Sequence, residues 1–153
     1  MITIRPARLH ESKTLTELCI RSKAHWGYDA AFMKASAAAL EIAPATIAQR
    51  NVWVAVDEWL SIVGVASIER LPNVCEFDLA HFFVEPSAMG RGVGRALFAA
   101  VVGAVKAQGG TRLTILSDPN AAPFYQRMGA VLLGDAPSDA IPNRRLPLLA
   151  YTL

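Results

Sequence analysis

A glycine-rich segment in the second half of the chain has the composition of a phosphate-binding turn. It follows an apolar run and precedes an amphipathic stretch, so its glycines fall where a helix is expected to begin. The first backbone N–H groups of a helix have no partner within it, and the helix dipole adds about half a positive charge there. Glycines also lack the Cβ atoms that would keep a ligand away. The segment therefore predicts a pyrophosphate site with arginines at its rim. Its residues are Met89, Gly90, Arg91, Gly92, Val93, Gly94 and Arg95.

Two common phosphate-binding motifs do not fit this segment. A P-loop requires a Gly-Lys pair, and the sequence contains none. A dinucleotide-binding turn has the pattern G-x-G-x-x-G, but a reading from Gly90 ends on Arg95 and a reading from Gly92 ends on Leu97. Another phosphate ligand is therefore indicated, and a glycine-rich helix start that binds nothing stays open as the alternative.

A second group of residues follows about one helix and one strand later. Asn120, Phe124 and Tyr125 lie in the segment 118–130, which ends in Met-Gly-Ala and is expected to form a short helix. An aromatic pair that only packs this helix against a sheet is the structural alternative.

Together the two segments resemble the motifs of the GCN5-related N-acetyltransferase (GNAT) superfamily. Gly92 and Gly94 match the G-x-G part of the family's acyl-CoA loop, whereas Met89 stands where glutamine or arginine is usual. The resemblance implies acetyl-CoA as co-substrate, with its pyrophosphate held mainly by main-chain N–H groups of the loop.

The same resemblance implies roles for the later segment. Asn120 would bond the pantetheine arm, Phe124 would pack on it, and Tyr125 would place its hydroxyl near the thioester sulfur. The implied reaction is direct attack of a neutral amine on the thioester in a ternary complex.

Such a reaction needs a base for the amine, a donor for the developing oxyanion and an acid for the leaving thiolate. Tyr125 is the candidate acid, since an unperturbed phenol pKa of about 10 and a thiol pKa of about 8–9 leave the transfer near balance. The resemblance assigns the oxyanion donor to main-chain groups of the strand before the loop. That strand ends Phe82-Phe83-Val84, which are expected to contact the co-substrate, and the main-chain groups of Phe83 and Val84 are the candidate donors.

Two residues of that strand are candidates for the general base. Asp78 occupies the place of a carboxylate that the family often uses through a water molecule. Strand alternation places Glu76 on the face of Asp78 and His81 on the opposite face. His81 has an ordinary pKa suited to proton transfer near neutral pH. A purely structural role stays open for both candidates.

The acceptor is expected beside a glycine break between two helices. Trp26, Tyr28 and Asp29 surround this break, which borders the acceptor pocket in the resembled superfamily. The two aromatic rings would form an apolar or cation-holding wall, and Asp29 would attract an amine. A hinge plugged by aromatic side chains is the alternative. The later loop 137–147 would close over this site, where Arg144 or Arg145 would meet a carboxylate; a plain solvated loop is the other reading.

The residues around these segments alternate between strand-like and helix-like periods. Strands are predicted at Ile2–Arg5, Val52–Val56, Ile62–Ile68, Cys75–Val84, Arg112–Leu116, Val131–Leu133 and Leu148–Leu153. Helices are predicted after a cap at Ser12, at Ala30–Leu40, Ala45–Arg50 and Val93–Gln108, and from the turn Ser117–Asn120 through Met128. This order indicates a single mixed α/β domain over residues 1–153. The resemblance implies a GNAT-like fold, whose mostly antiparallel sheet of about six or seven strands is flanked by about four helices.

Composition narrows the class of partner. The 153 residues carry a net charge of +2, too small for a general nucleic-acid binder, and no stretch of about 20 residues is apolar enough to suggest a membrane span. Cys19 and Cys75 form no metal-binding pattern with the histidines, so no metal is expected. They are interpreted as reduced core residues of a cytoplasmic protein. The apolar excess indicates a dense core or a homodimer interface.

The predicted function is therefore transfer of an acetyl group from acetyl-CoA to a primary amine of a small molecule or peptide. Two alternatives remain: a module of the same fold that senses acyl-CoA without turnover, and an unrelated nucleotide-binding protein.

Overall fold

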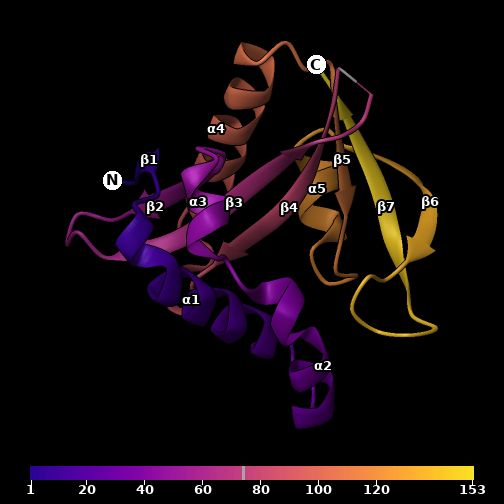
Figure 1. Ribbon diagram of the computed structural model, residues 1–153, viewed down its shortest axis with the longest axis horizontal. Coiled ribbons are helices and arrows are strands. Elements are labelled where there is room, and N and C mark those ends of the chain that lie inside the picture. Colours follow the sequence, from indigo (N-terminus) through magenta and orange to yellow (C-terminus); the bar gives the residue numbers. More distant parts are fainter. Residues whose placement is uncertain (74) are drawn as a thin grey trace.

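A seven-stranded sheet forms the centre of the molecule, with the strand order β1-β2-β3-β4-β5-β7-β6. The computed structural model describes residues 1–73 and 75–153. Neighbouring strands pair antiparallel, except for β4 and β5, which run parallel. The strands are β1 (Thr3–Pro6), β2 (Val52–Val56), β3 (Ile62–Arg70), β4 (Glu76–Val84), β5 (Arg112–Leu116), β6 (Val131–Pro137) and β7 (Arg145–Thr152). This arrangement confirms the predicted mixed, mostly antiparallel sheet (Figure 1).

Helices cover both faces of the sheet (Figure 1). On one face, α1 (Ser12–Ala24), α2 (Ala30–Leu40) and α3 (Pro44–Ala48) bury apolar side chains against β2 and β3. On the other face, α4 (Val93–Ala107) and α5 (Ala122–Arg127) enclose a second core with β3, β4, β5 and β7. Short 3-10 turns at Leu9–Glu11 and Pro86–Ala88 lead into α1 and towards α4. The sheet thus has a separate hydrophobic core on each side.

The parallel strands β4 and β5 stay together for only a short distance. Glu76–Asp78 pairs with Arg112–Thr114, and no further ladder pair joins the two strands among the described residues. The strands therefore separate towards the carboxyl end of β4, which opens a wedge in the middle of the sheet (Figure 1).

The pairing of β4 with its antiparallel neighbour β3 is interrupted by one extra residue on β4. Ser67 pairs with His81, whereas the next residue, Ile68, pairs with Leu79. Ala80 is therefore the extra residue of a β-bulge. Such an insertion moves every later side chain to the opposite face from the one that simple alternation predicts.

The bulge corrects the predicted orientation of His81. Paired residues lie on the same face of a sheet, and the partners of His81 and Asp78 are Ser67 and Glu69, two residues apart on a regular part of β3. His81 and Asp78 therefore share one face, and the expectation that they lie on opposite faces was wrong. The reason is the single inserted residue at Ala80, which no alternation pattern in the sequence reveals.

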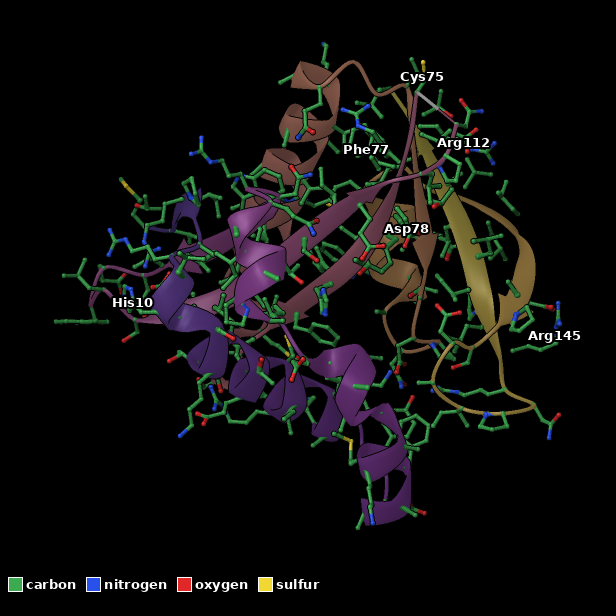
Figure 2. The ribbon with its side chains drawn as sticks, viewed as in Figure 1. His10, Cys75, Phe77, Asp78, Arg112 and Arg145 are labelled. Carbon is green, nitrogen blue, oxygen red and sulfur yellow. The ribbon has the colours of Figure 1, made fainter. Side chains whose placement is uncertain are left out.

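Two further local expectations were wrong. Ser12 does not cap α1 but is its first residue, and its hydroxyl donates a hydrogen bond of 2.6 Å to the carbonyl of Ile42. Of the two cysteines, both free, Cys19 is buried in the core as expected, whereas Cys75 is exposed. Figure 2 shows Cys75 at the outer end of β4, where the chain enters the strand.

No helix in the described part of the chain is long and apolar enough to cross a bilayer. Over the same residues, no group of three or more His, Cys, Asp or Glu side chains is placed to hold a metal ion.

Candidate active site

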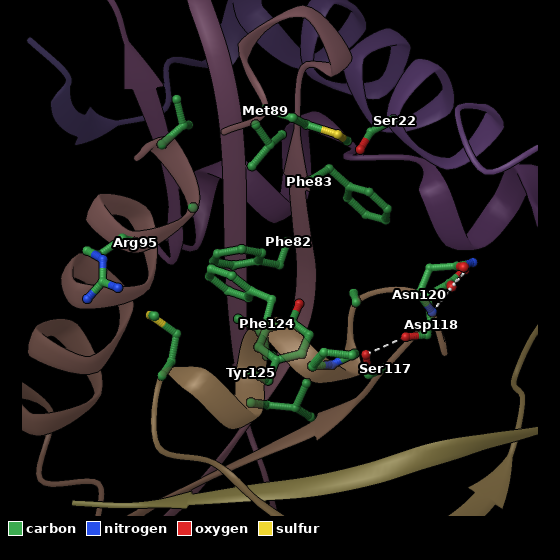
Figure 3. A pocket seen from close by; sticks show the side chains of 18 of the residues that line it. Ser22, Phe82, Phe83, Met89, Arg95, Ser117, Asp118, Asn120, Phe124 and Tyr125 are labelled. Atoms are coloured by element: carbon green, nitrogen blue, oxygen red, sulfur yellow. Dashed lines mark hydrogen bonds between the residues drawn. The ribbon is translucent and has the colours of Figure 1, made fainter. Parts of the chain in front are cut away.

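The wedge between β4 and β5 contains a cavity of about 620 Å³ (Figure 3). Its walls come from the end of β4, the turn before α4, the end of β5, helix α5 and the end of α1. It brings together most of the residues that the sequence singled out. Those that line it are Trp26, Phe82, Phe83, Val84, Met89, Gly90, Gly92, Val93, Gly94, Arg95, Asn120, Phe124 and Tyr125.

The glycine turn forms the wall at one end of this cavity. Gly90 and Gly92 have φ angles of +79° and +82°, in the left-handed region that side chains with a Cβ rarely adopt. Gly92 is the N-cap of α4, and no side chain in the described part of the chain caps the helix there. The first-turn N–H groups of a 15-residue helix are therefore left without a side-chain partner at the edge of the cavity. This arrangement fits an anionic group such as a pyrophosphate.

Gly94 lies where helix α4 meets the second sequence segment. A Cβ at this position would lie 3.1–3.2 Å from two ring carbons of Phe124. The glycine therefore allows the start of α4 to approach the aromatic ring closely. The two motifs, 30 residues apart in the chain, are in direct contact by this means.

Aromatic rings form the middle of the cavity wall. Phe82, Phe124 and Tyr125 are in mutual contact, with 5.6 Å between the ring centroid of Phe82 and each of the other two and 5.3 Å between those of Phe124 and Tyr125. Phe98 of α4 packs edge-on against Phe82 and Phe124 from behind. Figure 3 shows Phe82, Phe124 and Tyr125 together at the centre of the cavity. These interlocked rings hold the Tyr125 side chain in one position.

Burial changes the acid–base character of Tyr125. The residue is only 5% exposed, and burial, aided by the charge of Asp118, raises the pKa of its phenol above the ordinary value. Proton transfer from Tyr125 to a leaving thiolate is therefore less favourable than an unperturbed phenol pKa predicts. Tyr125 stays protonated over the whole physiological range and is a neutral hydrogen-bond donor at the cavity wall.

The other end of the cavity carries charge. Asp118, which follows β5, accepts hydrogen bonds from the Lys23 ammonium at 2.6 Å and from the Tyr28 hydroxyl at 2.7 Å. Arg144, from the loop between β6 and β7, donates to the same Tyr28 hydroxyl at 2.8 Å and lies 3.9 Å from the Asp118 carboxylate. We call Lys23, Tyr28, Asp118 and Arg144 the Asp118 cluster. Burial alone would raise the pKa of Asp118, but the hydrogen bonds from Lys23 and Tyr28 outweigh it and hold that pKa below its usual value.

Sequence reasoning missed two members of this cluster. The local pattern indicates Asp118 only as part of a turn that opens a helix, and it gives Lys23 no role of its own. A signal was present, because Asp118 directly follows an apolar strand and stands two residues before Asn120. Its partners, however, are 95 and 90 positions away in the chain.

Several predicted residues already have protein partners. Asn120 donates its side-chain amide to Asp118 at 2.8 Å, and Asp29 accepts a hydrogen bond from the Phe32 backbone N–H as the N-cap of α2. Arg91 lies 3.7 Å from Glu58 and does not line the cavity, unlike Arg95. Tyr28 and Asp29 do not line it either, whereas Trp26 does.

The two candidate bases lie beside the cavity rather than in its wall. Asp78 accepts a hydrogen bond of 2.8 Å from the Thr114 hydroxyl, and burial raises the pKa of its carboxyl. His81 shares a hydrogen bond of 2.7 Å with Ser67 through Nδ1, while its buried Nε2 has no hydrogen-bond partner among the described residues. Burial lowers the pKa of this imidazole, so His81 is neutral near neutral pH.

Comparison with known proteins identifies the fold. The structure resembles a GCN5-related N-acetyltransferase from Rhodopseudomonas palustris, with 23% identity and a TM-score of 0.77 over 99% of this chain and 95% of that chain. It also resembles the PaiA N-acetyltransferase from Thermoplasma acidophilum, solved in complex with coenzyme A, with 12% identity and a TM-score of 0.77 over 100% and 99%. A GCN5-related N-acetyltransferase from Kribbella flavida has 19% identity and a TM-score of 0.71 over 99% and 98%. No curated protein matches the sequence.

The model of the acetyltransferase (GNAT) domain family matches residues 11–137, from the turn before α1 to the end of β6. This span contains the glycine turn, the aromatic segment and the wedge between them. The chain therefore belongs to the GNAT acetyltransferase family, as its motifs predicted, and is an acyltransferase.

Proposed function

We propose that this chain transfers an acetyl group from acetyl-CoA to a primary amine of a small molecule or peptide, by direct attack in a ternary complex. The observation that carries the proposal is one cavity with an uncapped helix start at one end and the Tyr125 phenol in its wall. Bound acetyl-CoA would supply an acyl group activated as a thioester. The chain's own residues must bind it, polarise its carbonyl and control two protons.

The residues available for binding fit the parts of the co-substrate. The backbone N–H groups at Gly92, Val93 and Gly94 suit the pyrophosphate, and Arg95 adds positive charge at that end. Phe82 and Phe124 offer an apolar surface for the pantetheine arm. Asn120 and Met89, which line the same cavity, complete the proposed binding set; Arg91 reaches it only if it leaves Glu58.

The strand register narrows the choice of oxyanion donor. The backbone N–H of Glu85 donates to Val63 in β3, and successive N–H groups of a strand point to alternate edges. The N–H of Phe83 is thus directed at β3, whereas those of Phe82 and Val84 are directed at the wedge, where β5 has separated. Of the two expected donors, this geometry favours Val84 over Phe83, and it adds the N–H of Phe82 as a further main-chain donor.

Tyr125 is proposed as the donor to the leaving sulfur. Because its raised pKa makes full proton transfer unfavourable, the phenol would act mainly by donating a hydrogen bond while charge develops on sulfur. The departing thiolate would take its proton from solvent.

Asp78 is proposed as the base that accepts the amine proton through a water molecule, with His81 as the second candidate. Asp118 is the only carboxylate among the described cavity-lining residues, and Lys23, Tyr28 and Asn120 already bond its oxygens. Asp78 lies at the apex of the wedge next to the cavity-lining Leu79, and its raised pKa strengthens it as a base.

The test is amine-dependent release of free thiol from acetyl-CoA, with mass-spectrometric detection of the N-acetylated product across a panel of primary amines. We expect release with at least one class of amine. Tight binding of coenzyme A without amine-dependent release would instead support the alternative, a module that senses acyl-CoA without turnover.

We also propose that the protein is a cytoplasmic homodimer. Val131, Leu132 and Leu133 are half or more exposed on the edge strand β6, an apolar surface suited to a second copy. Free Cys19 and Cys75 agree with a reducing compartment. Light scattering that gives the monomer mass at micromolar concentration would overturn the dimer, and cell fractionation tests the location.

A further inference from the structure

We propose that the Asp118 cluster is the acceptor subsite for an anionic group, and that the acceptor is therefore an amine that also carries a carboxylate, such as an amino acid. This inference rests on the proposed acetyl transfer to an amine. The observation behind it is an uncompensated positive charge at the end of the cavity opposite the glycine turn.

The charges of the cluster do not balance. Lys23 and Arg144 carry one positive charge each, and Asp118 is the only carboxylate within 4.0 Å of either among the described residues. The side chains of Lys23, Asp118 and Arg144 are only 14%, 11% and 20% exposed, so solvent screens the excess poorly. A partly buried site with two cations and one anion is suited to one further anion.

The guanidinium of Arg144 is fixed in place and has N–H donors available for such a group. Its guanidinium lies 4.8 Å from the ring centroid of Phe32 and 5.2 Å from that of Tyr28, and these two rings stack on each other at 4.0 Å. The only hydrogen bond that the guanidinium makes with the described residues goes to the Tyr28 hydroxyl. A guanidinium has five N–H donors in a planar fork that matches a carboxylate, so most of its donors remain for a ligand.

The position of the cluster suits an acceptor rather than the acyl donor. Figure 3 shows Asp118 and Asn120 at one side of the cavity and Arg95 at the other, with Phe82 and Tyr125 between them. Lys23 and Asp118 line the cavity itself, whereas Tyr28 and Arg144 lie next to these two residues, outside the cavity lining. A carboxylate held there would leave the amine of the same molecule directed towards the middle of the cavity and the Tyr125 phenol.

The cluster also argues against a cationic acceptor group at this end. The faces of Tyr28 and Phe32, which would hold a cation, are covered by the cluster's own cations: the Lys23 ammonium lies 5.1 Å from the Tyr28 centroid, and Arg144 lies over both rings. Asp29, the acid expected to attract an amine, instead caps α2. A polyamine would therefore be repelled where an amino-carboxylate is attracted.

The experiment compares amino acids with their amides, which keep the amine and the side chain but lack the carboxylate charge. Thiol release from acetyl-CoA gives kcat/KM for each pair. We expect the acids to be preferred by about tenfold or more, as the loss of a charged hydrogen-bond partner predicts. Equal or faster turnover of the amides would overturn the inference while leaving the proposed acetyl transfer intact.

Arginine variants locate the effect. Arg144→Gln should lower kcat/KM for the acids much more than for the amides and so abolish the preference for acids. Arg144→Lys should keep part of the preference, since lysine retains the charge but not the fork. The matched control is Arg145→Gln, because the neighbouring Arg145 pairs with Asp135 on strand β6. An equal loss of preference in Arg145→Gln, or an undiminished preference in Arg144→Gln, would contradict the assignment.

A binding measurement separates this inference from the proposed function. Calorimetric titration of the same acids and amides into the coenzyme A-loaded protein needs no turnover. Binding of acids that requires Arg144, without thiol release from any amine, would support the anion subsite and overturn the transfer. Failure of the acids to bind more tightly than the amides would overturn the subsite.

Discussion

Tyr125 illustrates how one side chain in this site is adjusted by its surroundings. Its ring is packed between Phe82, Phe98 and Phe124, so the hydroxyl has little freedom to move. The same packing removes water from the phenol and raises its pKa. A neutral, immobile donor is more useful for stabilising a charge that appears only during reaction than for net proton transfer.

Removal of this hydroxyl tests the assignment. Tyr125→Phe is expected to lower kcat by about 10- to 100-fold while changing the coenzyme A dissociation constant by less than about twofold, because the donor acts only when charge develops. Steady-state kinetics and calorimetry measure the two effects. An unchanged kcat would remove Tyr125 from the mechanism.

The two candidate bases respond differently to amide substitution. Asp78→Asn keeps an oxygen for the Thr114 hydroxyl but cannot accept a proton, so kcat/KM should fall by about 100-fold. The remaining kcat/KM should no longer decrease at low pH, because the titrating group has been removed. Burial raises the pKa of this carboxyl in the fold, so its ionised form is disfavoured there and destabilises the protein once the pH exceeds the unfolded pKa. The variant should therefore be at least as stable as the wild type near neutral pH by urea unfolding.

His81→Gln is the matched comparison for this pair. The glutamine can still bond Ser67, so we expect a change in stability without loss of the pH-dependent decrease in kcat/KM. If His81→Gln rather than Asp78→Asn removed that decrease, the base would be His81.

At the scale of secondary-structure elements, the start of helix α4 contributes two features to the site. It begins with the unprotected N–H groups of the glycine turn, and its first turn lies against the ring of Phe124 from α5. The β4 bulge makes a comparable adjustment in the sheet, since it turns Phe82 and Val84 to the α4 side while Phe83 packs beside the α1 core. Both devices direct backbone groups and rings into the same wedge.

Two glycines of α4 allow an internal comparison. A Cβ added at Gly103 would meet no neighbouring side chain within 4 Å, whereas a Cβ added at Gly94 would lie 3.1 Å from Phe124. Gly103→Ala should therefore raise the free energy of unfolding by about 0.5–1 kcal/mol through better helix propensity. Gly94→Ala should gain less, and its coenzyme A affinity should fall by about tenfold, because Phe124 must move. Urea unfolding and calorimetry would contradict this if the two variants behaved alike.

At the scale of the whole molecule, a partly buried ion pair links the N-terminal strand β1 to the start of α1. Arg5 of β1 donates two hydrogen bonds, of 3.0 and 2.7 Å, to the Glu11 carboxylate just before α1. The backbone N–H of Arg8 donates a third, of 2.7 Å. The Arg5 hydrogen bonds, against an opposing effect of burial, hold the pKa of Glu11 below its usual value.

This pair predicts a specific dependence of stability on pH. A carboxyl whose pKa is lowered by folding stabilises the protein above its unfolded pKa, about 4.3, and this stabilisation is lost as the pH falls through the folded pKa. Glu11→Gln should cost about 1–3 kcal/mol near neutral pH, and its difference from the wild type should shrink in acid. Glu17→Gln, at an exposed position of α1, should change stability by less than about 0.5 kcal/mol. A difference independent of pH would contradict the assignment to the Glu11 charge.

The sequence by itself determined the features that depend on local order. The glycine turn, helix α4, the aromatic pair of α5 and nearly all strand positions follow from turn residues and from periods of 2 and 3.6, which reach only a few residues along the chain. The family resemblance rests on the same short segments, and the structure brings them into one cavity.

Only the tertiary structure decided the rest. The bulge at Ala80 depends on the register between two strands, so no alternation rule could place His81. The Asp118 cluster joins Lys23, Tyr28 and Arg144, and its contacts to Asp118 cross as many as 95 positions of the chain. The pKa shifts of Tyr125 and Asp78 arise from burial. All three depend on which residues, distant in the chain, come into contact after folding. No local sequence pattern specifies those contacts.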